Sequence, residues 1–203
     1  MPNLTIPELL AVYSPFYPAF NTDEFHHYLR TFDVDAGSHL RQLSFGQKKK
    51  AYISFALASN TQVLIMDEPT NGLDIPSKLQ FRNIVTHANR NDKITILSTH
   101  QVRDLDDLIT AILIVDHGKL LLYADKQTIN KKLYFETSVS LPADRSIIYS
   151  EPTPKGIAVI SENRDRSDSY LDIEILFNAT LAEPAKFKFL FDSSTNTTDH
   201  ELQ

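Results

Sequence analysis

The sequence contains no cysteine among its 203 residues. This absence excludes disulfide bonds and metal sites with thiolate ligands, and it fits a cytosolic setting. The chain also lacks the basic excess that a broad nucleic-acid surface requires, because its 20 basic and 26 acidic residues give a net charge of −6. We therefore expect no nucleic acid among its partners.

Long apolar runs are absent too. The longest, residues 63–66 and 111–115, fall far short of the roughly 20 residues that a membrane-spanning helix requires. Residues 1–4 have neither a basic leader nor an apolar core, so they do not resemble a signal peptide. We expect any membrane association to depend on a partner.

The composition that remains is globular, with 42% hydrophobic and 23% charged residues. Thr5 and Glu8 form a capping-box pattern, with Pro7 in the first turn, which predicts a short helix ending near Tyr13. Asn21 is a second N-cap candidate. The helix that it begins carries one apolar face, formed by Phe25, Tyr28, Leu29 and Phe32. Residues 1–42 are thus expected to form a small helical unit.

A third helix is predicted to begin at a second capping box, in which Ser44 caps the helix and Gln47 reaches back to the Ser44 amide. Its first turns carry Lys48, Lys49 and Lys50. Cations oppose the positive end of a helix dipole unless an anion is nearby, and a helix start of this kind is suited to bind one. The ordinary alternatives are a simple helix cap for Ser44 to Gln47 and, for the lysines, a solvated basic face or a contact with an acidic loop.

A strand–helix–strand unit follows. Residues 63–66 form a continuous apolar run, typical of a strand buried on both faces of a parallel sheet. A helix begins near Pro76, and its apolar face is expected to consist of Phe81, Ile84, Val85 and Ala88. A second strand spans residues 94–97. Ligands of such sheets bind beyond the carboxyl ends of the strands.

The second half of the chain is less regular. A short helix over residues 102–108 is expected to precede a hairpin, with strands 111–115 and 120–123, that closes the sheet edge. Beyond residue 130 the pattern predicts a small α+β appendage. Its expected elements are short strands within 135–141, 147–150 and 157–160, a segment at 171–177 that fits both strand and helix and for which we favour helix, and a disordered tail from residue 192.

Polar residues with catalytic potential follow both strands of the unit. Asp67 and Glu68 end the first strand, and His100 follows the second. An aspartate here can orient a magnesium ion through water, a glutamate can polarise an attacking water, and a histidine can hydrogen-bond a phosphate. Each residue alone has an ordinary reading: a solvated acidic turn for the pair, a surface position for the histidine. Their order and spacing make these readings jointly improbable.

In this order the motifs closely resemble those of the ATP-binding subunit of ABC transporters. Leu43-Ser44-Phe45-Gly46-Gln47 resembles the family's LSGGQ signature, residues 63–67 its Walker B strand, and residues 71–74 its D-loop. The resemblance implies that Glu68 is the catalytic glutamate, His100 the switch histidine and Asp67 the ligand of Mg²⁺, through water. It further implies that Ser44, Phe45, Gly46, Gln47 and Asp74 contact an ATP held by an opposing subunit.

The sequence departs from the family pattern in three places. Phe45 replaces a glycine and Asn71 replaces a more usual serine. None of the five glycines begins the phosphate-binding loop G-x-x-x-x-G-K-[ST]. We therefore expect an ATPase without its first third, which alone neither binds ATP tightly nor hydrolyses it.

The expected fold class is α/β: a P-loop NTPase-like parallel sheet with a helical subdomain, N-terminally incomplete, plus a small α+β C-terminal appendage. The expected divisions are a helical subdomain at 1–42, the ATPase core at 43–130, the appendage at 131–191 and the tail at 192–203. The resemblance implies an ATP-hydrolysing subunit that drives transport by a membrane permease. It would pair head to tail with a second ATPase domain in the cytoplasm, at the inner face of the cell membrane. The alternatives are a catalytically silent partner module and a non-transport ABC ATPase.

Overall fold

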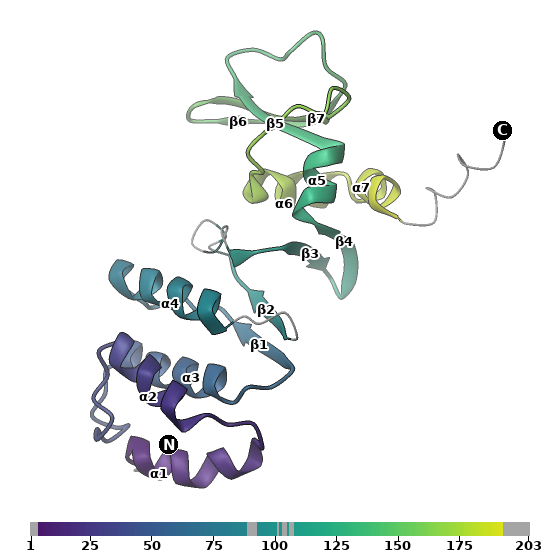
Figure 1. Cartoon of the computed structure of the whole chain (residues 1–203). Helices are drawn as coiled ribbons and strands as arrows, with labels where there is room; N and C mark the ends of the chain where they lie inside the picture. Colours follow the sequence, from purple (N-terminus) through teal and green to yellow (C-terminus); the bar gives the residue numbers. More distant parts are fainter. Residues whose placement is uncertain (1–3, 89–92, 101, 103–104, 106–107, 193–203) are drawn as a thin grey trace, which may run out of the picture. The chain divides into compact units, whose positions relative to one another are not determined.

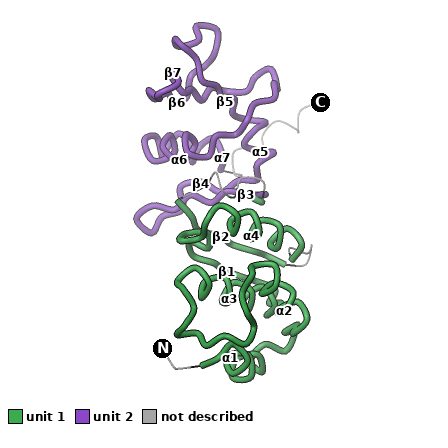
Figure 2. Tube along the Cα trace, turned by 90° about the vertical axis from the view of Figure 1, so that its left-hand side faces the viewer, with its two compact units in different colours: residues 1–108 green, residues 109–203 purple. Residues whose placement is uncertain are grey.

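The computed structural model describes residues 4–88, 93–100, 102, 105 and 108–192. Two compact units divide the chain, residues 1–108 and 109–203 (Figures 1 and 2). The boundary differs from the division at residue 130 that the sequence suggested. The reason is that the segment after residue 109 pairs with itself and packs on the C-terminal helices.

The first unit begins with helices whose starts are fixed by local caps. Thr5 and Glu8 form the predicted capping box, and the Asn21 side chain accepts hydrogen bonds from the amides of Asp23 and Glu24. The elements are α1 (Ile6–Tyr13), the 3-10 turn η1 (Ser14–Phe16), α2 (Thr22–Thr31) and α3 (Phe45–Ala58). Their buried side chains include Phe25, Leu29 and Phe32, as the apolar pattern predicted.

The strand–helix–strand unit has the predicted parallel topology. Strand β1 (Val63–Asp67) pairs with β2 (Ile94–Ser98), and α4 (Ile75–Ala88) connects them. The register aligns Asp67 with Ser98, so both strands end at one edge. On α4, Phe81, Ile84 and Val85 are buried as expected, and Ala88 is half-buried.

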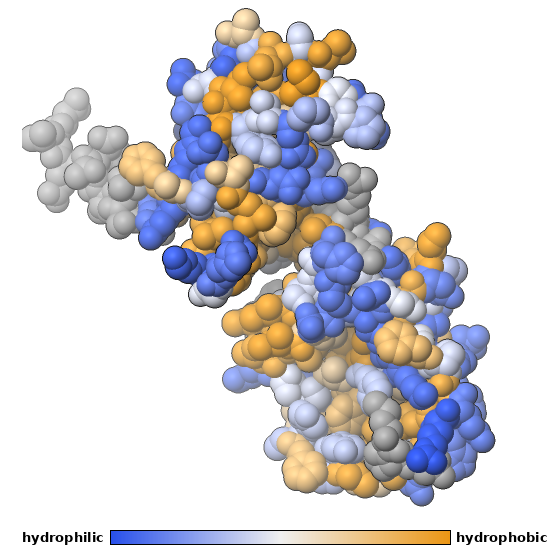
Figure 3. Space-filling model, turned by 180° about the vertical axis from the view of Figure 1, so that it is seen from behind, coloured by the Kyte–Doolittle hydropathy of each residue, from blue (hydrophilic) through white to orange (hydrophobic). Residues whose placement is uncertain are grey.

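The expectation that the first strand is buried on both faces was wrong. Leu57 of α3, Leu64 of β1 and Val85 of α4 line one small cavity, which places both helices against one face of the sheet. The side chains of Val63 and Ile65 point the other way and are 51% and 69% exposed. Successive residues of a strand alternate between faces, and among the described residues nothing covers the second face. A space-filling view shows hydrophobic surface on both units (Figure 3).

The second unit begins with the predicted hairpin. Strand β3 (Ala111–Asp116) pairs antiparallel with β4 (Lys119–Asp125). His117 and Gly118 both have positive φ, of 46° and 72°, as a two-residue type I′ turn requires. However, the hairpin forms a two-stranded sheet of its own. The expectation that it closes the edge of the parallel sheet was wrong.

The appendage has the predicted α+β character. Its sheet has the order β5–β7–β6, with both pairs antiparallel, and the ambiguous segment is helical. The elements are α5 (Lys126–Lys132), β5 (Leu133–Ser138), β6 (Ile147–Thr153), β7 (Gly156–Glu162), α6 (Ile173–Ala182) and α7 (Pro184–Phe191). The core of the unit includes Leu133, Ile160, Leu176 and Phe187. The helix expected at 102–108 and the disordered tail fall almost wholly outside the described residues.

Candidate nucleotide-hydrolysis site

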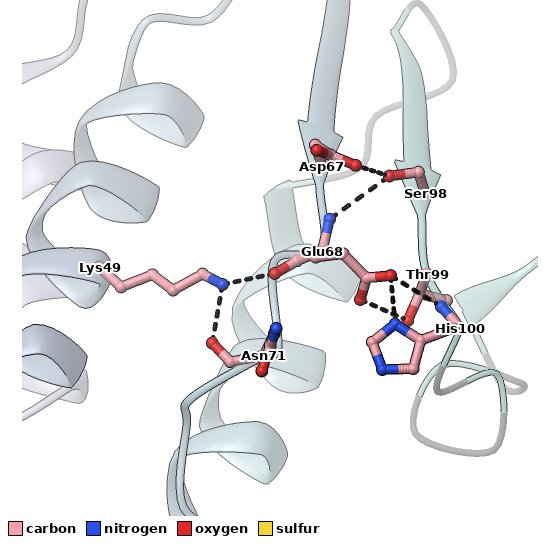
Figure 4. A network of polar contacts seen from close by, with 7 residues as sticks. All are labelled: Lys49, Asp67, Glu68, Asn71, Ser98, Thr99 and His100. Atoms are coloured by element: carbon pink, nitrogen blue, oxygen red, sulfur yellow. Dashed lines mark hydrogen bonds and ion pairs between the residues drawn. The ribbon is translucent and has the colours of Figure 1, made fainter.

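The candidate site lies where the two parallel strands end (Figure 4). Because Asp67 and Ser98 are register partners, the residues that follow each strand lie side by side. The Ser98 hydroxyl donates a short hydrogen bond to Asp67 Oδ1, and the Glu68 amide donates to the Ser98 carbonyl at 2.9 Å. The parallel pairing thus brings the predicted Asp67, Glu68 and His100 to one edge.

Glu68 and His100 contact each other directly. Glu68 Oε1 accepts a hydrogen bond from the His100 amide at 2.9 Å and lies 2.5 Å from His100 Nδ1. The Thr99 hydroxyl donates to Glu68 Oε2 at 3.3 Å. Partial burial raises the pKa of the Glu68 carboxyl, but the hydrogen bonds and charge of His100, with Thr99, outweigh it, so that the pKa lies below its ordinary value. Glu68 is therefore ionised at neutral pH, the form that accepts a proton.

The backbone at Glu68 is unusual. Its φ is 45°, in the left-handed region that non-glycine residues seldom adopt. Such residues cluster at functional sites and persist when surrounding contacts hold them. Here the Glu68 amide is held by Ser98, and the Glu68 carbonyl accepts a short hydrogen bond from Lys49 Nζ. The same Lys49 ammonium donates to the Asn71 carbonyl at 2.7 Å.

The signature residues lie at the start of α3. The Gln47 amide donates to Ser44 Oγ at 3.2 Å, and the Ser44 amide donates to Gln47 Oε1 at 3.0 Å, which completes the predicted capping box. Phe45 is 73% exposed. Its ring lies over Gly72, where a built Cβ would be 2.8 Å from Phe45 Cε1. The signature start and the loop after β1 are therefore in contact.

Asp74 lies at the start of α4, at the far end of the loop that begins with Glu68. Its Oδ1 accepts a hydrogen bond from the Ser77 amide at 2.9 Å. Hydrogen bonds from the side chain and backbone of Ser77 lower the pKa of the Asp74 carboxyl. In this structure Asp74 acts as a helix cap. Contact with a nucleotide stays a prediction for it, as for Ser44, Phe45, Gly46 and Gln47.

The donor set at Asp67 suits one kind of metal site. Among the residues that the structure describes, no three His, Asp or Glu side chains gather as a metal-binding group. A single carboxylate beside the Ser98 hydroxyl is the environment that Mg²⁺ accepts when nucleotide phosphates and water supply its other ligands. Asp67 therefore fits a Mg²⁺ that arrives with ATP, and it does not fit a metal held by protein alone.

Three participants were not assigned a role from the sequence. Ser98 and Thr99 bind the two carboxylates, and their position opposite Asp67 in the parallel register was the available signal. Lys49 was interpreted together with its neighbours as an anion-binding group, a solvated face or a contact with an acidic loop. The structure directs its ammonium to the carbonyls of Glu68 and Asn71, on the loop that carries Glu68, which agrees with the third of these alternatives. The sequence offers no signal that separates Lys49 from Lys48 and Lys50.

Comparison with known proteins supports the resemblance. The sequence model of the ABC transporter family matches residues 2–71. The energy-coupling factor transporter ATP-binding protein EcfA2 of Mycoplasmoides gallisepticum is 30% identical over 103 residues, which cover 50% of this chain and 32% of the relative. The chain spans about a third of the length of the first curated relatives it matches.

Solved structures show the same fold. The ATP-binding subunit of an ABC transporter superposes with a TM-score of 0.56 at 21% identity, covering 64% of this chain and 56% of that one. A bacterial ABC transporter cassette, solved as a dimer, gives a TM-score of 0.51 at 21% identity, covering 62% and 58%. The chain is therefore similar in sequence to ATP-binding proteins of ABC transporters over part of its length, and its mixed α/β fold is similar to that of their cassettes.

Proposed function

We propose that this chain supplies the hydrolytic and signature parts of an ABC-type ATPase that drives transport by a separate membrane permease. The observation that carries this proposal is the Glu68 carboxyl group, hydrogen-bonded to His100 at the end of a parallel strand pair, within one loop of the signature helix. The Glu68–His100 pair and the signature helix are both on this chain. No helix among the described residues is long and apolar enough to cross a membrane.

Each residue has a role in this proposal. Glu68 accepts a proton from the attacking water, and His100 donates a hydrogen bond to the γ-phosphate. Asp67 would hold the Mg²⁺ that accompanies ATP, and this cation would offset the negative charge of the phosphates. Ser44, Phe45, Gly46, Gln47 and Asp74 contact a nucleotide that is held by a second ATPase domain, packed head to tail. The cytoplasmic face of the cell membrane is the proposed location.

The β- and γ-phosphates need a further set of donors. These 203 residues contain no G-x-x-x-x-G-K-[ST] loop, whose amides and lysine hold the phosphates in P-loop ATPases. We therefore expect turnover only when a polypeptide that carries this loop is present. The transported substrate is chosen by the permease and has no counterpart among the residues described.

The test is ATP turnover by the chain mixed with a complete ABC ATP-binding subunit and its permease in vesicles. Glu68→Gln removes the proton acceptor at nearly constant size, and we expect turnover at sites that depend on this chain to fall by about 10²- to 10⁴-fold. Glu174→Gln, on α6 in the other unit, is the matched control and should leave turnover unchanged. Equal rates for Glu68→Gln and the unaltered chain would refute the hydrolytic role.

The missing phosphate loop favours a second candidate, a silent partner that contributes only its signature face. In that case Ser44→Arg, which crowds the start of α3, would abolish stimulation of the complete subunit, and Glu68→Gln would have no effect. Loss of turnover with both variants favours the hydrolytic role. Copurification with a permease distinguishes either candidate from a non-transport ABC ATPase.

A further inference from the structure

Lys49 connects two parts of the candidate site that the chain separates. It lies near the N-terminal end of α3, close behind the signature residues. Its ammonium donates to the carbonyl of Glu68 and, at 2.7 Å, to the carbonyl of Asn71. Both carbonyls belong to the loop after β1 (Figure 4). One side chain therefore ties the signature helix to the loop that carries the candidate base.

The position is electrostatically unfavourable for a cation unless it has partners. The N-terminal end of a helix carries positive partial charge, which opposes a lysine there. Burial lowers the pKa of the Lys49 ammonium, and the carboxylates of Glu68 and Asp67 only partly offset this. The two carbonyl oxygens supply the compensating negative partial charge. Their hydrogen bonds to an ammonium are charge-assisted and stronger than those between neutral groups.

The three consecutive lysines differ in what they contact. Lys50 Nζ donates to the Phe32 carbonyl at 3.3 Å, within the helical part of the unit. Lys48 has no side-chain hydrogen bond among the described residues, and it is half-buried. Of the three ammonium groups, only that of Lys49 is hydrogen-bonded to the loop after β1, whereas Lys50 acts on Asp74 through its charge. This difference gives Lys49 a specific role and gives Lys48 the position of a matched control.

The backbone conformation of Glu68 sets the direction in which its side chain leaves the loop. With φ at 45°, the residue has a conformation that a non-glycine residue leaves readily when nothing holds it. Ser98 holds the amide side, and both the Lys49 ammonium and the Asn71 amide donate to the carbonyl side. In this orientation the carboxylate reaches the amide and ring of His100. Without the Lys49 contact, the carbonyl keeps only the hydrogen bond from the Asn71 amide, at 3.2 Å.

We propose that Lys49 is a positioning residue, which holds the Glu68 peptide so that its carboxylate faces His100 and which links that carboxylate to the signature end of α3. The link to hydrolysis rests on the proposed function of Glu68, whereas the link to Glu68 geometry does not. Because Ser44 and Lys49 lie on the same helix end, a contact made at the signature is transmitted to the peptide of Glu68.

The test compares Lys49→Met, Lys49→Arg and Lys48→Met in the full chain, by amide hydrogen exchange and by ¹H–¹⁵N NMR at one pH. We expect Lys49→Met to speed exchange at the Glu68 and His100 amides by about tenfold or more, the effect of losing a charge-assisted hydrogen bond, and to shift the His100 amide resonance. Lys49→Arg can donate to both carbonyls and should restore most of the protection. Lys48→Met should match the unaltered chain.

Unchanged exchange and an unchanged His100 resonance in Lys49→Met would overturn the proposal. So would equal losses of protection in Lys49→Arg and Lys49→Met, because the donor would then be irrelevant. If Lys49→Met does not fold, Lys49→Gln, which keeps one donor, takes its place and should show an intermediate change; an unchanged spectrum in Lys49→Gln overturns the proposal in the same way.

A second readout separates this proposal from the proposed function. In the turnover assay with a complete subunit, Lys49→Met should lower kcat for ATP and leave KM within about twofold, since the Lys49 ammonium is directed to two backbone carbonyls. A rise in KM with unchanged kcat would contradict a positioning role. If Glu68→Gln has no effect on turnover, the hydrolytic function fails, and the exchange and NMR measurements still decide whether Lys49 positions Glu68.

Discussion

At the scale of single residues, Gly72 shows why the loop after β1 needs a glycine. Its φ is +77°, and a Cβ there would lie 2.8 Å from Phe45 Cε1. Gly46, at the start of α3, is also close, because a Cβ built on it would be 3.4 Å from the Gly72 carbonyl oxygen. The phenyl ring that replaces a signature glycine therefore covers the loop, and it leaves little room on Gly72.

We predict that Gly72→Ala destabilises the chain. The left-handed conformation costs a non-glycine residue about 1–2 kcal/mol, and the contact with Phe45 adds to this. In Phe45→Ala/Gly72→Ala the contact is relieved and the backbone cost remains. The free energy of unfolding lost through Gly72→Ala should therefore be smaller in the Phe45→Ala background than in the unaltered chain, but not zero. Urea unfolding followed by circular dichroism measures all three. An unaltered midpoint for Gly72→Ala would contradict the close approach.

Tyr149 provides a prediction about pH. Its hydroxyl donates to Glu151 Oε2 at 2.7 Å, and this hydrogen bond, with burial and the Glu151 charge, raises the pKa of Tyr149 to about 12. The ordinary value is about 10. Because the folded-state pKa is raised, the stabilisation is fully present below pH 10 and is lost as the pH rises towards 12.

The measurement is tyrosinate absorbance at 295 nm and pH 11. The unaltered chain should retain one neutral phenol that Tyr149→Phe lacks. Glu151→Gln removes the charge of the acceptor, and we expect its Tyr149 to ionise at lower pH than in the unaltered chain. If Glu151→Gln and the unaltered chain titrate identically, the hydrogen bond to Glu151 does not control this phenol.

At the scale of elements, β1 has one protected face and one exposed face. Met66 is 8% exposed and Ile65 is 69% exposed, although both belong to one apolar run. We predict that Met66→Ala lowers the free energy of unfolding by about 2–5 kcal/mol, whereas Ile65→Thr changes it by about 0.5 kcal/mol or less. Thermal and urea unfolding of the two variants provide the comparison. A large loss for Ile65→Thr would show that this face is covered in solution.

Local signals predicted α1 to α4 and α6, whereas α5 and α7 were not predicted. The caps at Thr5, Asn21 and Ser44 act within one helical turn, so the residues that form them are neighbours in the sequence. The turn of the β3–β4 hairpin is equally local. The segments that cover a strand or pair with it can lie far away in the sequence. For this reason the predictions that β1 is buried on both faces and that the hairpin closes the edge of the parallel sheet were wrong.

In the candidate site, too, some features could be predicted from the sequence and others could not. Asp67, Glu68 and His100 were identified because each follows an apolar strand and because parallel strands end at one edge. The hydrogen bonds from Ser98 and Thr99 and the specific role of Lys49 depend on side-chain direction. Three successive lysines look alike in a sequence, but on a helix they point about 100° apart. Only one of them can meet the loop.

At the scale of the whole molecule, the two units differ in character. The first contains the parallel strand pair and the residues matched by the ABC transporter family model, 2–71. The second contains only antiparallel pairs among its described residues. The polar groups of the candidate site that the structure describes all lie in the first unit. We therefore attribute the proposed hydrolytic role to residues 1–108.

The content of this first unit leads to a prediction about ATP. A tightly held ATP needs donors for its phosphates, and these 203 residues lack the G-x-x-x-x-G-K-[ST] loop that supplies them. We expect calorimetry of the chain alone to show no ATP binding tighter than about 1 mM, which corresponds to roughly −4 kcal/mol. Micromolar binding by the chain alone would contradict this reading.

Addition of a complete ABC ATP-binding subunit should change the result, because a nucleotide held by that subunit can be met by the signature end of α3. We expect ATP to promote a complex of the two chains, measured by size-exclusion chromatography with light scattering, when hydrolysis is blocked by Glu68→Gln. Ser44→Arg places a large side chain at the signature and should prevent the complex, whereas Lys48→Met should not. A complex that forms equally without ATP would show that the nucleotide does not lie between the two chains.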